Sequence, residues 1–267
     1  MPRTRISPSW LLLPILALAG IVVVNACSSR PTVGHATVGD WTLALSCAGP
    51  RDGGVTVWLE HGIGSRASSS TWIPVFEQVS EFAHVCRYDR PGAGDSPTVP
   101  PYGARTYADN MVDLLETVGA RDRLIVVGHS FGGYPARILA QEQPTRVQAL
   151  ILVDTVAESL GLRAATGAEA WSEVPAGSEP IDLAAFERAV RPSLAMPVTV
   201  LSRGRDLTPA WSRAQRTLLS LHPASHLQIV EGSGHMIPTE APDAVVTAIR
   251  EAVARARQGT PAPIPDR

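Results

Sequence analysis

A serine flanked by glycines is the residue of this chain best suited to covalent chemistry. The segment Gly128-His129-Ser130-Phe131-Gly132 has the G-x-S-x-G pattern, follows the apolar run 124–127 and opens a helical stretch near Tyr134. Between a strand and a helix, this pattern places the serine on a sharp, strained turn that has no room for neighbouring side chains. Because a free serine hydroxyl is a poor nucleophile near neutral pH, the chemistry also needs a base. The pattern predicts Ser130 as a nucleophile.

The rest of the chain alternates between two kinds of apolar pattern that would position this turn. Short, continuously apolar runs rich in β-branched residues are typical of strands buried on both faces of a parallel sheet. These runs are residues 55–59, 124–127, 149–153, 198–201 and 227–230. Between them, apolar residues recur at helical spacing, as at Met111, Leu114, Leu115 and Val118, and at Val245, Val246, Ile249 and Val253. The alternation predicts crossover helices and a doubly wound, mostly parallel α/β sheet.

With these elements in place, the sequence resembles the α/β-hydrolase family from about Trp41 to Ala254. Apart from the serine turn, four pieces match the family pattern in the expected order: His61-Gly62-Ile63-Gly64, the D-R-P-G-x-G-x-S turn at residues 89–96, Asp206 nine residues after Pro197, and Gly232-Ser233-Gly234-His235. The order Ser, Asp, His is the one this family uses. The resemblance implies the α/β-hydrolase fold with a short helical cap inserted at about residues 155–196.

The resemblance also implies a role for each residue of the site. His235 would act as general base and then as general acid, and the backbone N–H groups of Ile63 and Phe131 would stabilise the oxyanion. A carboxylate beside His235 would hold its tautomer and offset its charge. We favour Asp206 as this acid, although it follows two arginines and could be an ordinary ion-pair partner. The alternative is Asp154, at the end of the 149–153 strand, from which some family members supply the acid.

The cap and the two other histidines of these motifs have simpler interpretations. Asp182 is an N-cap candidate before Leu183, Phe186 and Val190, whose helical spacing predicts one lid helix. His129 and His61 are interpreted as hydrogen-bonding residues that stabilise their loops. Nothing supplies the clustered spacing of a metal site, so we expect no metal and no cofactor.

The first 27 residues have the pattern of an export signal. Arg3 and Arg5 precede an apolar segment of 15 residues from Trp10 to Val24, and no acidic residue occurs before Asp40. The segment Val24-Asn25-Ala26-Cys27 resembles a bacterial lipobox, in which the cysteine is lipidated. An ordinary signal peptide and an uncleaved anchor remain alternatives. The sequence thus predicts an exported protein of the cell envelope, lipid-anchored or secreted.

The other two cysteines support export. Cys47 and Cys86 lie in two strand-like runs that could be neighbours in one sheet. Two cysteines in an oxidising compartment commonly pair, so a disulfide is expected and two buried thiols are the alternative. The domain would extend over residues 28–257, followed by a Pro-rich, unstructured tail at 258–267.

Composition excludes several classes of protein. With 45% apolar and 18% charged residues, the chain can bury a core, which disfavours disorder and a polytopic membrane protein. A net charge of −2 provides no basic field for nucleic acid. We expect a monomer whose partners are a small-molecule ester and, through a lipid or an N-terminal anchor, a membrane surface.

The leading hypothesis is a serine hydrolase that cleaves carboxylic esters through an acyl-enzyme on Ser130. An amidase, thioesterase, peptidase or perhydrolase would use the same residues. A serine at position 130 disfavours epoxide hydrolases and haloalkane dehalogenases, which need a carboxylate nucleophile. From a different class, the alternative is a non-catalytic binding protein of the envelope on the hydrolase scaffold.

Overall fold

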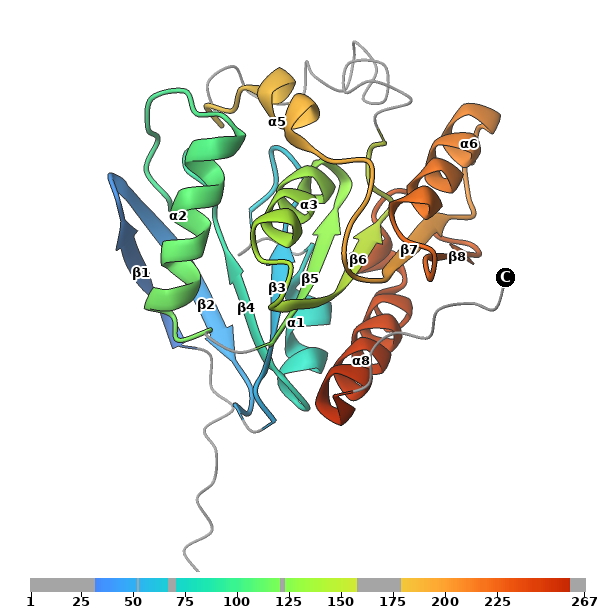
Figure 1. The fold of residues 1–267 in the computed structure, drawn as a ribbon, viewed down its shortest axis with the longest axis horizontal. Helices are drawn as coiled ribbons and strands as arrows, with labels where there is room; N and C mark the ends of the chain where they lie inside the picture. Colours follow the sequence, from blue (N-terminus) through green and yellow to red (C-terminus); the bar gives the residue numbers. More distant parts are fainter. Residues whose placement is uncertain (1–31, 52, 67–70, 121–122, 158–178, 260–267) are drawn as a thin grey trace, which may run out of the picture.

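The computed structural model describes residues 32–51, 53–66, 71–120, 123–157 and 179–259 (Figure 1). The predicted export segment with Cys27, the middle of the cap insertion (residues 158–178) and the tail beyond residue 259 lie outside the described residues. Among the helices that are described, none combines the length and the apolar character needed to cross a membrane.

Eight strands form one sheet in the order β1-β2-β4-β3-β5-β6-β7-β8. They are β1 (Thr32–Val38), β2 (Trp41–Ala48), β3 (Val55–Glu60), β4 (His84–Tyr88), β5 (Arg123–His129), β6 (Val147–Val153), β7 (Val198–Arg203) and β8 (His226–Val230). β4 and β3 pair in parallel, as do all neighbours from β3 to β8, whereas β1 and β2 are antiparallel to their neighbours. The five predicted strands and the doubly wound, mostly parallel sheet are therefore confirmed.

Helices cover both faces of the sheet (Figure 1). They are α1 (Ile73–Ser80), α2 (Ala104–Thr117), α3 (Gly133–Glu142), α5 (Leu183–Ala189), α6 (Pro209–Thr217), α7 (Ile237–Glu240) and α8 (Pro242–Gln258). Successive residues of a strand point to opposite faces. In β5, Leu124 and Val126 pack in the core beneath α2, α3, α5 and α6, while Ile125 and Val127 pack in the core that includes α1 and α8. Burial on both faces explains why the strands are continuously apolar.

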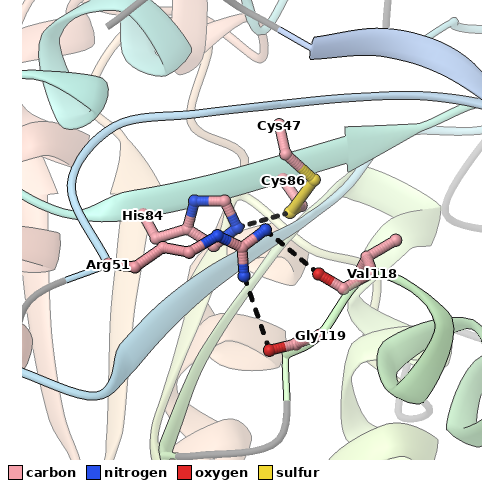
Figure 2. The surroundings of a disulfide bond; sticks show 6 residues. All are labelled: Cys47, Arg51, His84, Cys86, Val118 and Gly119. Atoms are coloured by element: carbon pink, nitrogen blue, oxygen red, sulfur yellow. Dashed lines mark hydrogen bonds between the residues drawn. A yellow bond between two sulfur atoms is a disulfide. The ribbon is translucent and has the colours of Figure 1, made fainter. Parts of the chain in front are cut away.

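The predicted disulfide is present between β2 and β4. Cys47 and Cys86 are register partners on these antiparallel strands, and their sulfurs are bonded (Figure 2). His84 lies two residues before Cys86, with Nε2 3.5 Å from Sγ. These three residues place their ligand atoms within 4.8 Å of one another. Because both sulfurs belong to the disulfide, neither is the thiolate that a metal ion would need.

Candidate active site

The serine turn has the geometry that its glycines predict. Ser130 begins a short 3₁₀ turn, Ser130–Gly132, between β5 and α3, and its φ is +54°. A Cβ atom on Gly128 would lie 2.5 Å from the carbonyl oxygen of Gly132, and one on Gly132 would lie 2.4 Å from that of Glu60. No other residue fits at these two positions without moving the backbone. Positive φ is unusual for serine, and strain of this kind concentrates at functional sites.

Ser130, His235 and Asp154 form a continuous hydrogen-bonded line. The Ser130 hydroxyl lies 2.9 Å from His235 Nε2, and His235 Nδ1 lies 2.6 Å from Oδ2 of Asp154. With Nδ1–H donating to the carboxylate, Nε2 is free to accept the serine proton. Ser130 and Asp154 follow the neighbouring parallel strands β5 and β6, whose carboxyl ends lie at the same edge of the sheet. The loop after β8 brings His235 to this edge.

Asp206 is not part of this line, so the expectation that it would lie against His235 is wrong. Its side chain is 79% exposed and lies 3.6 Å from Nε of Arg205. The turn after β7 is held instead by backbone bonds from the N–H of Arg205 to the carbonyl of Ser233 and from Gly204 to Val230. The alternative acid, Asp154, occupies the place that had been expected for Asp206.

The Asp154 carboxylate is fully buried and surrounded by donors. Besides His235, Oδ1 accepts from the indole N–H of Trp211 at 2.8 Å and from the backbone N–H of Arg203 at 3.1 Å. The Arg203 side chain adds an ion pair, with Nε 2.7 Å from Oδ2, although this N–H is not aimed at the oxygen. Burial would raise the pKa of Asp154, but the bond to His235 and the charge of Arg203 lower it below its ordinary value.

Sequence reasoning missed Arg203 and Trp211. Arg203 ends β7, and its guanidinium stacks over the Trp211 ring at 4.1 Å while Nη2 lies 3.2 Å from His235 Nδ1. Trp211 lies in the first turn of α6, which Thr208 caps by accepting a hydrogen bond from the Trp211 N–H. The Thr208-Pro209 pair is a helix-start signal that could have placed Trp211 near the carboxyl ends of the strands.

The two motif histidines stabilise loops, as predicted. His129 Nε2–H donates to the backbone carbonyl of His235 at 2.8 Å. Burial, together with the neighbouring His235, lowers the pKa of His129 to about 3, so this ring is neutral at ordinary pH. His61 Nδ1 bonds the Gly62 carbonyl, and its Nε2 accepts from the Arg90 N–H. Burial and the charge of Arg90 hold the pKa of His61 well below its ordinary value.

The two residues predicted to supply oxyanion donors lie beside Ser130. Phe131 follows Ser130 in the 3₁₀ turn and is buried. The loop that carries Ile63 passes next to Ser130, since a Cβ atom on Gly62 would lie 3.2 Å from Ser130 Cβ and 3.7 Å from Oγ. The donor roles of Ile63 and Phe131 remain predictions, and this placement is what they require.

The predicted lid helix is α5. The Asp182 side chain caps it by accepting from the Ala185 N–H at 3.0 Å. Phe186 is buried, and its ring lies 5.7 Å from that of Phe131 and 5.4 Å from that of Tyr107. Figure 1 shows α5 over α3, at the end of the sheet to which β5 and β6 point. The cap therefore contacts the residue next to Ser130.

Comparisons with known proteins agree with this architecture. A model of the family described as alpha/beta hydrolase fold matches residues 55–213. An uncharacterized protein of Mycobacterium tuberculosis is 36% identical over 125 residues, which are 46% of this chain and 35% of that protein. A putative carbamate hydrolase of Variovorax paradoxus is 36% identical over 109 residues, or 40% of each chain. The chain thus spans well under half the length of the curated relatives it matches.

Solved structures extend the likeness over most of the chain. An esterase from Thermogutta terrifontis superposes with a TM-score of 0.66 at 23% identity, covering 85% of this chain and 99% of that one. The enol-lactonase from Burkholderia xenovorans superposes with a TM-score of 0.64 at 21% identity, covering 83% of this chain and 100% of that one. At such identities the likeness shows the fold.

Proposed function

This chain belongs to the alpha/beta hydrolase family, and from that premise we propose that it is a serine hydrolase that cleaves carboxylic esters. The observation that carries the proposal is the line from Ser130 Oγ through His235 to Asp154, with separations of 2.9 and 2.6 Å. A nucleophile, a base and a carboxylate that orients the base are the parts that acyl transfer needs. The fold alone would not support this function, since one fold hosts many.

Each step of the reaction uses a group at this edge of the sheet. His235 Nε2 takes the proton of Ser130 as Oγ attacks the ester carbonyl, and the N–H groups of Ile63 and Phe131 stabilise the oxyanion. Collapse of the tetrahedral intermediate breaks the ester C–O bond, and His235 gives its proton to the leaving alcohol. Water then attacks the acyl-enzyme with His235 as base, which releases the acid and restores Ser130. The ionised Asp154 offsets the charge of His235 in both halves.

The choice of esters rests on the neighbours as well as on the site. Solved structures with this fold include proteins described as an esterase, a carboxylesterase and an enol-lactonase. All three names describe cleavage of an acyl C–O bond. The same line of groups could also cleave an amide or a thioester. A chain-length series of nitrophenyl esters, set against the matching anilides and thioesters, measures the preference directly.

The test of the catalytic proposal is covalent labelling. A fluorophosphonate probe should label the wild-type protein, and peptide mapping should place the adduct on Ser130. Ser130→Ala should lose both labelling and ester turnover while keeping its circular-dichroism melting curve. A folded Ser130→Ala protein with undiminished turnover would contradict the proposal, and an unlabelled, inactive wild type would favour a binding protein on the same scaffold.

We also propose that the chain is exported and held at the cell envelope by a lipid on Cys27. The apolar segment from Trp10 to Val24, the lipobox-like residues 24–27 and the Cys47–Cys86 disulfide support this. Mass spectrometry of non-reduced protein from its native envelope should find a lipid-modified N-terminal Cys27 and the intact disulfide. An unprocessed N-terminus with free thiols would contradict export.

A further inference from the structure

A buried arginine binds the loop that carries Ile63. Arg90 is fully buried, and it donates from Nη1 to the carbonyl of His61 at 2.7 Å and from Nη2 to that of Gly62 at 3.0 Å. The Gly62 carbonyl and the Ile63 N–H belong to one trans peptide, so they point in opposite directions. The same Gly62 carbonyl also accepts from His61 Nδ1 at 2.8 Å and from the Ser65 N–H at 3.3 Å. By holding this carbonyl with them, Arg90 helps to fix the direction of the Ile63 N–H.

A glutamate from the cap completes this arrangement. The side chain of Glu179 is 1% exposed, and its Oε2 accepts from Arg90 Nε at 2.8 Å. Its other oxygen, Oε1, accepts from the backbone N–H of Gly64 at 2.7 Å. The peptides on both sides of Ile63 are therefore held, one through Arg90 and one by Glu179 itself.

The segment around Glu179 is fixed to the body of the protein. The Tyr102 N–H donates to the carbonyl of Pro180, and the Asp182 N–H donates to that of Tyr102, each at 2.9 Å. Tyr102 and Ile181 form a parallel bridge. The Glu179 carboxylate is thus presented at a defined place by backbone bonds on its C-terminal side.

Of the two carboxylates beside the Arg90 guanidinium among the described residues, Glu179 is the nearer one. The other carboxylate nearby, Glu60, lies 3.8 Å from Nη1 and already accepts from the side chains of Trp58, Tyr88 and Tyr107. Burial lowers the pKa of Arg90, but Glu179 and its other neighbours raise it above the ordinary value. Without Glu179, the guanidinium would lose its 2.8 Å partner. Removing one partner of a buried pair is strongly destabilising for the group left behind.

We propose that Glu179 is a positioning residue that ties the cap to the oxyanion loop, His61-Gly62-Ile63-Gly64. Through its contacts with Arg90 and with the Gly64 N–H, Glu179 orients the Ile63 N–H toward the oxyanion that forms on the substrate at Ser130. This inference rests on the proposed serine-hydrolase function. It assigns a role in catalysis to a cap residue that lies outside the Ser130–His235–Asp154 line.

Substitution of Glu179 should act on the transition state more than on substrate binding. An oxyanion donor contributes only as charge develops, and removing one costs about 10²–10³ in kcat. Because Glu179→Ala would loosen a donor without removing it, we expect kcat to fall about 10- to 100-fold with KM within twofold. An alkyl boronic acid, which forms a tetrahedral adduct with the serine, should lose affinity by the same factor. If Glu179 had a purely structural role, its substitution would lower the melting temperature without equal losses in kcat and in boronate affinity.

Two further variants keep the test decisive. Glu179→Gln retains an acceptor for the Gly64 N–H but places a neutral amide, in place of the carboxylate, beside Arg90. Its kcat should lie between those of wild type and Glu179→Ala. If the alanine variant folds poorly, the glutamine variant alone should still have a kcat below that of wild type. The matched control is Glu187→Gln on α5, which should leave kcat and boronate affinity unchanged. A folded Glu179 variant with wild-type kcat and boronate affinity, or with a loss in KM alone, would overturn the inference. An unlabelled, inactive wild type would instead overturn the proposed function and, with it, this role.

Discussion

Two aspartates that follow adjacent strands both have a positive φ, but their side chains have opposite surroundings. Asp154 follows β6 with a φ of +45°, and Asp206 follows β7, three residues after it ends, with a φ of +57°. The side chain of Asp154 is 0% exposed, whereas that of Asp206 is 79% exposed. Its position after a strand and a positive φ are therefore not enough to identify an aspartate as the catalytic acid. Burial among donors distinguishes the two.

The position of each strand explains the difference. β6 lies next to β5, which carries Ser130, while β7 is one strand further away. The backbone N–H of Asp154 bonds the carbonyl of Leu201 in β7 at 2.7 Å, which fixes its turn between the two strands. The end of β7 contributes Arg203 to the site, and its side chain occupies the space beside Asp154. Asp206 is exposed and lies 3.6 Å from Arg205 instead.

The largest expected effect is on the activity of the two asparagine variants. Asp154→Asn removes the carboxylate that orients His235, and the corresponding change in serine proteases costs about 10⁴-fold in kcat. Asp206→Asn removes an exposed charge and should change kcat by less than about twofold. Both variants should be compared by steady-state ester hydrolysis at matched folding. A large loss in Asp206→Asn, with Asp154→Asn near wild type, would reverse the assignment made from the structure.

Sequence patterns were sufficient for features that depend on local order. The buried strands, the Ser130 turn, the His235 loop and the Asp182 cap each follow from spacing over a few residues. The pairing of Cys47 with Cys86 was predicted from two runs that could be neighbours and from the expectation of export. The acid could not be settled this way because Asp154 and Asp206 follow two successive strands, and the family resemblance allows the acid after either one.

The choice between those aspartates depends on tertiary contacts. Trp211 and Arg203 are 57 and 49 residues away from Asp154 along the chain. The link from the cap to the oxyanion loop is similar, since Glu179 and Gly64 are separated by 115 residues. The motifs D-R-P-G and H-G-I-G named Arg90 and Ile63, but not the bonds that join them. Such bonds form only when distant segments fold together.

The next effect concerns the free energy of unfolding at acid pH. It depends on His129, which lies beside the buried Asp154–His235 pair and not beside the exposed Asp206. His129, which bonds the His235 backbone on the buried side, has a pKa of about 3 in the folded protein. An unfolded histidine takes up a proton below about pH 6.5. The unfolded state therefore binds more protons between these values, so stability is present above pH 6.5 and is lost as the pH falls toward 3.

Replacing His129 should reduce this loss of stability at acid pH. His129→Gln can still donate to the His235 carbonyl, but it cannot take up a proton in the unfolded state. Its free energy of unfolding should fall less steeply than that of wild type between pH 6.5 and 5, by up to about 1.4 kcal/mol per pH unit for one proton. Urea unfolding at several pH values measures the two slopes. Parallel slopes would mean that His129 is protonated in the folded protein as readily as in the unfolded one.

The smallest expected effect tests whether the donors around Asp154 matter for turnover. Trp211→Phe keeps a ring beneath the Arg203 guanidinium but removes the indole N–H that bonds Oδ1 at 2.8 Å. A bond to a charged group contributes about 1.5–3 kcal/mol, and the carboxylate keeps its contacts with His235 and Arg203. We therefore expect kcat/KM to fall about 10-fold. The matched control is Phe76→Leu, a buried ring of α1 in the core that includes α8, which should lower the melting temperature without a selective loss of turnover. If Trp211→Phe behaves like the control, the indole serves only packing, and the contrast between Asp154 and Asp206 rests on burial and on Arg203.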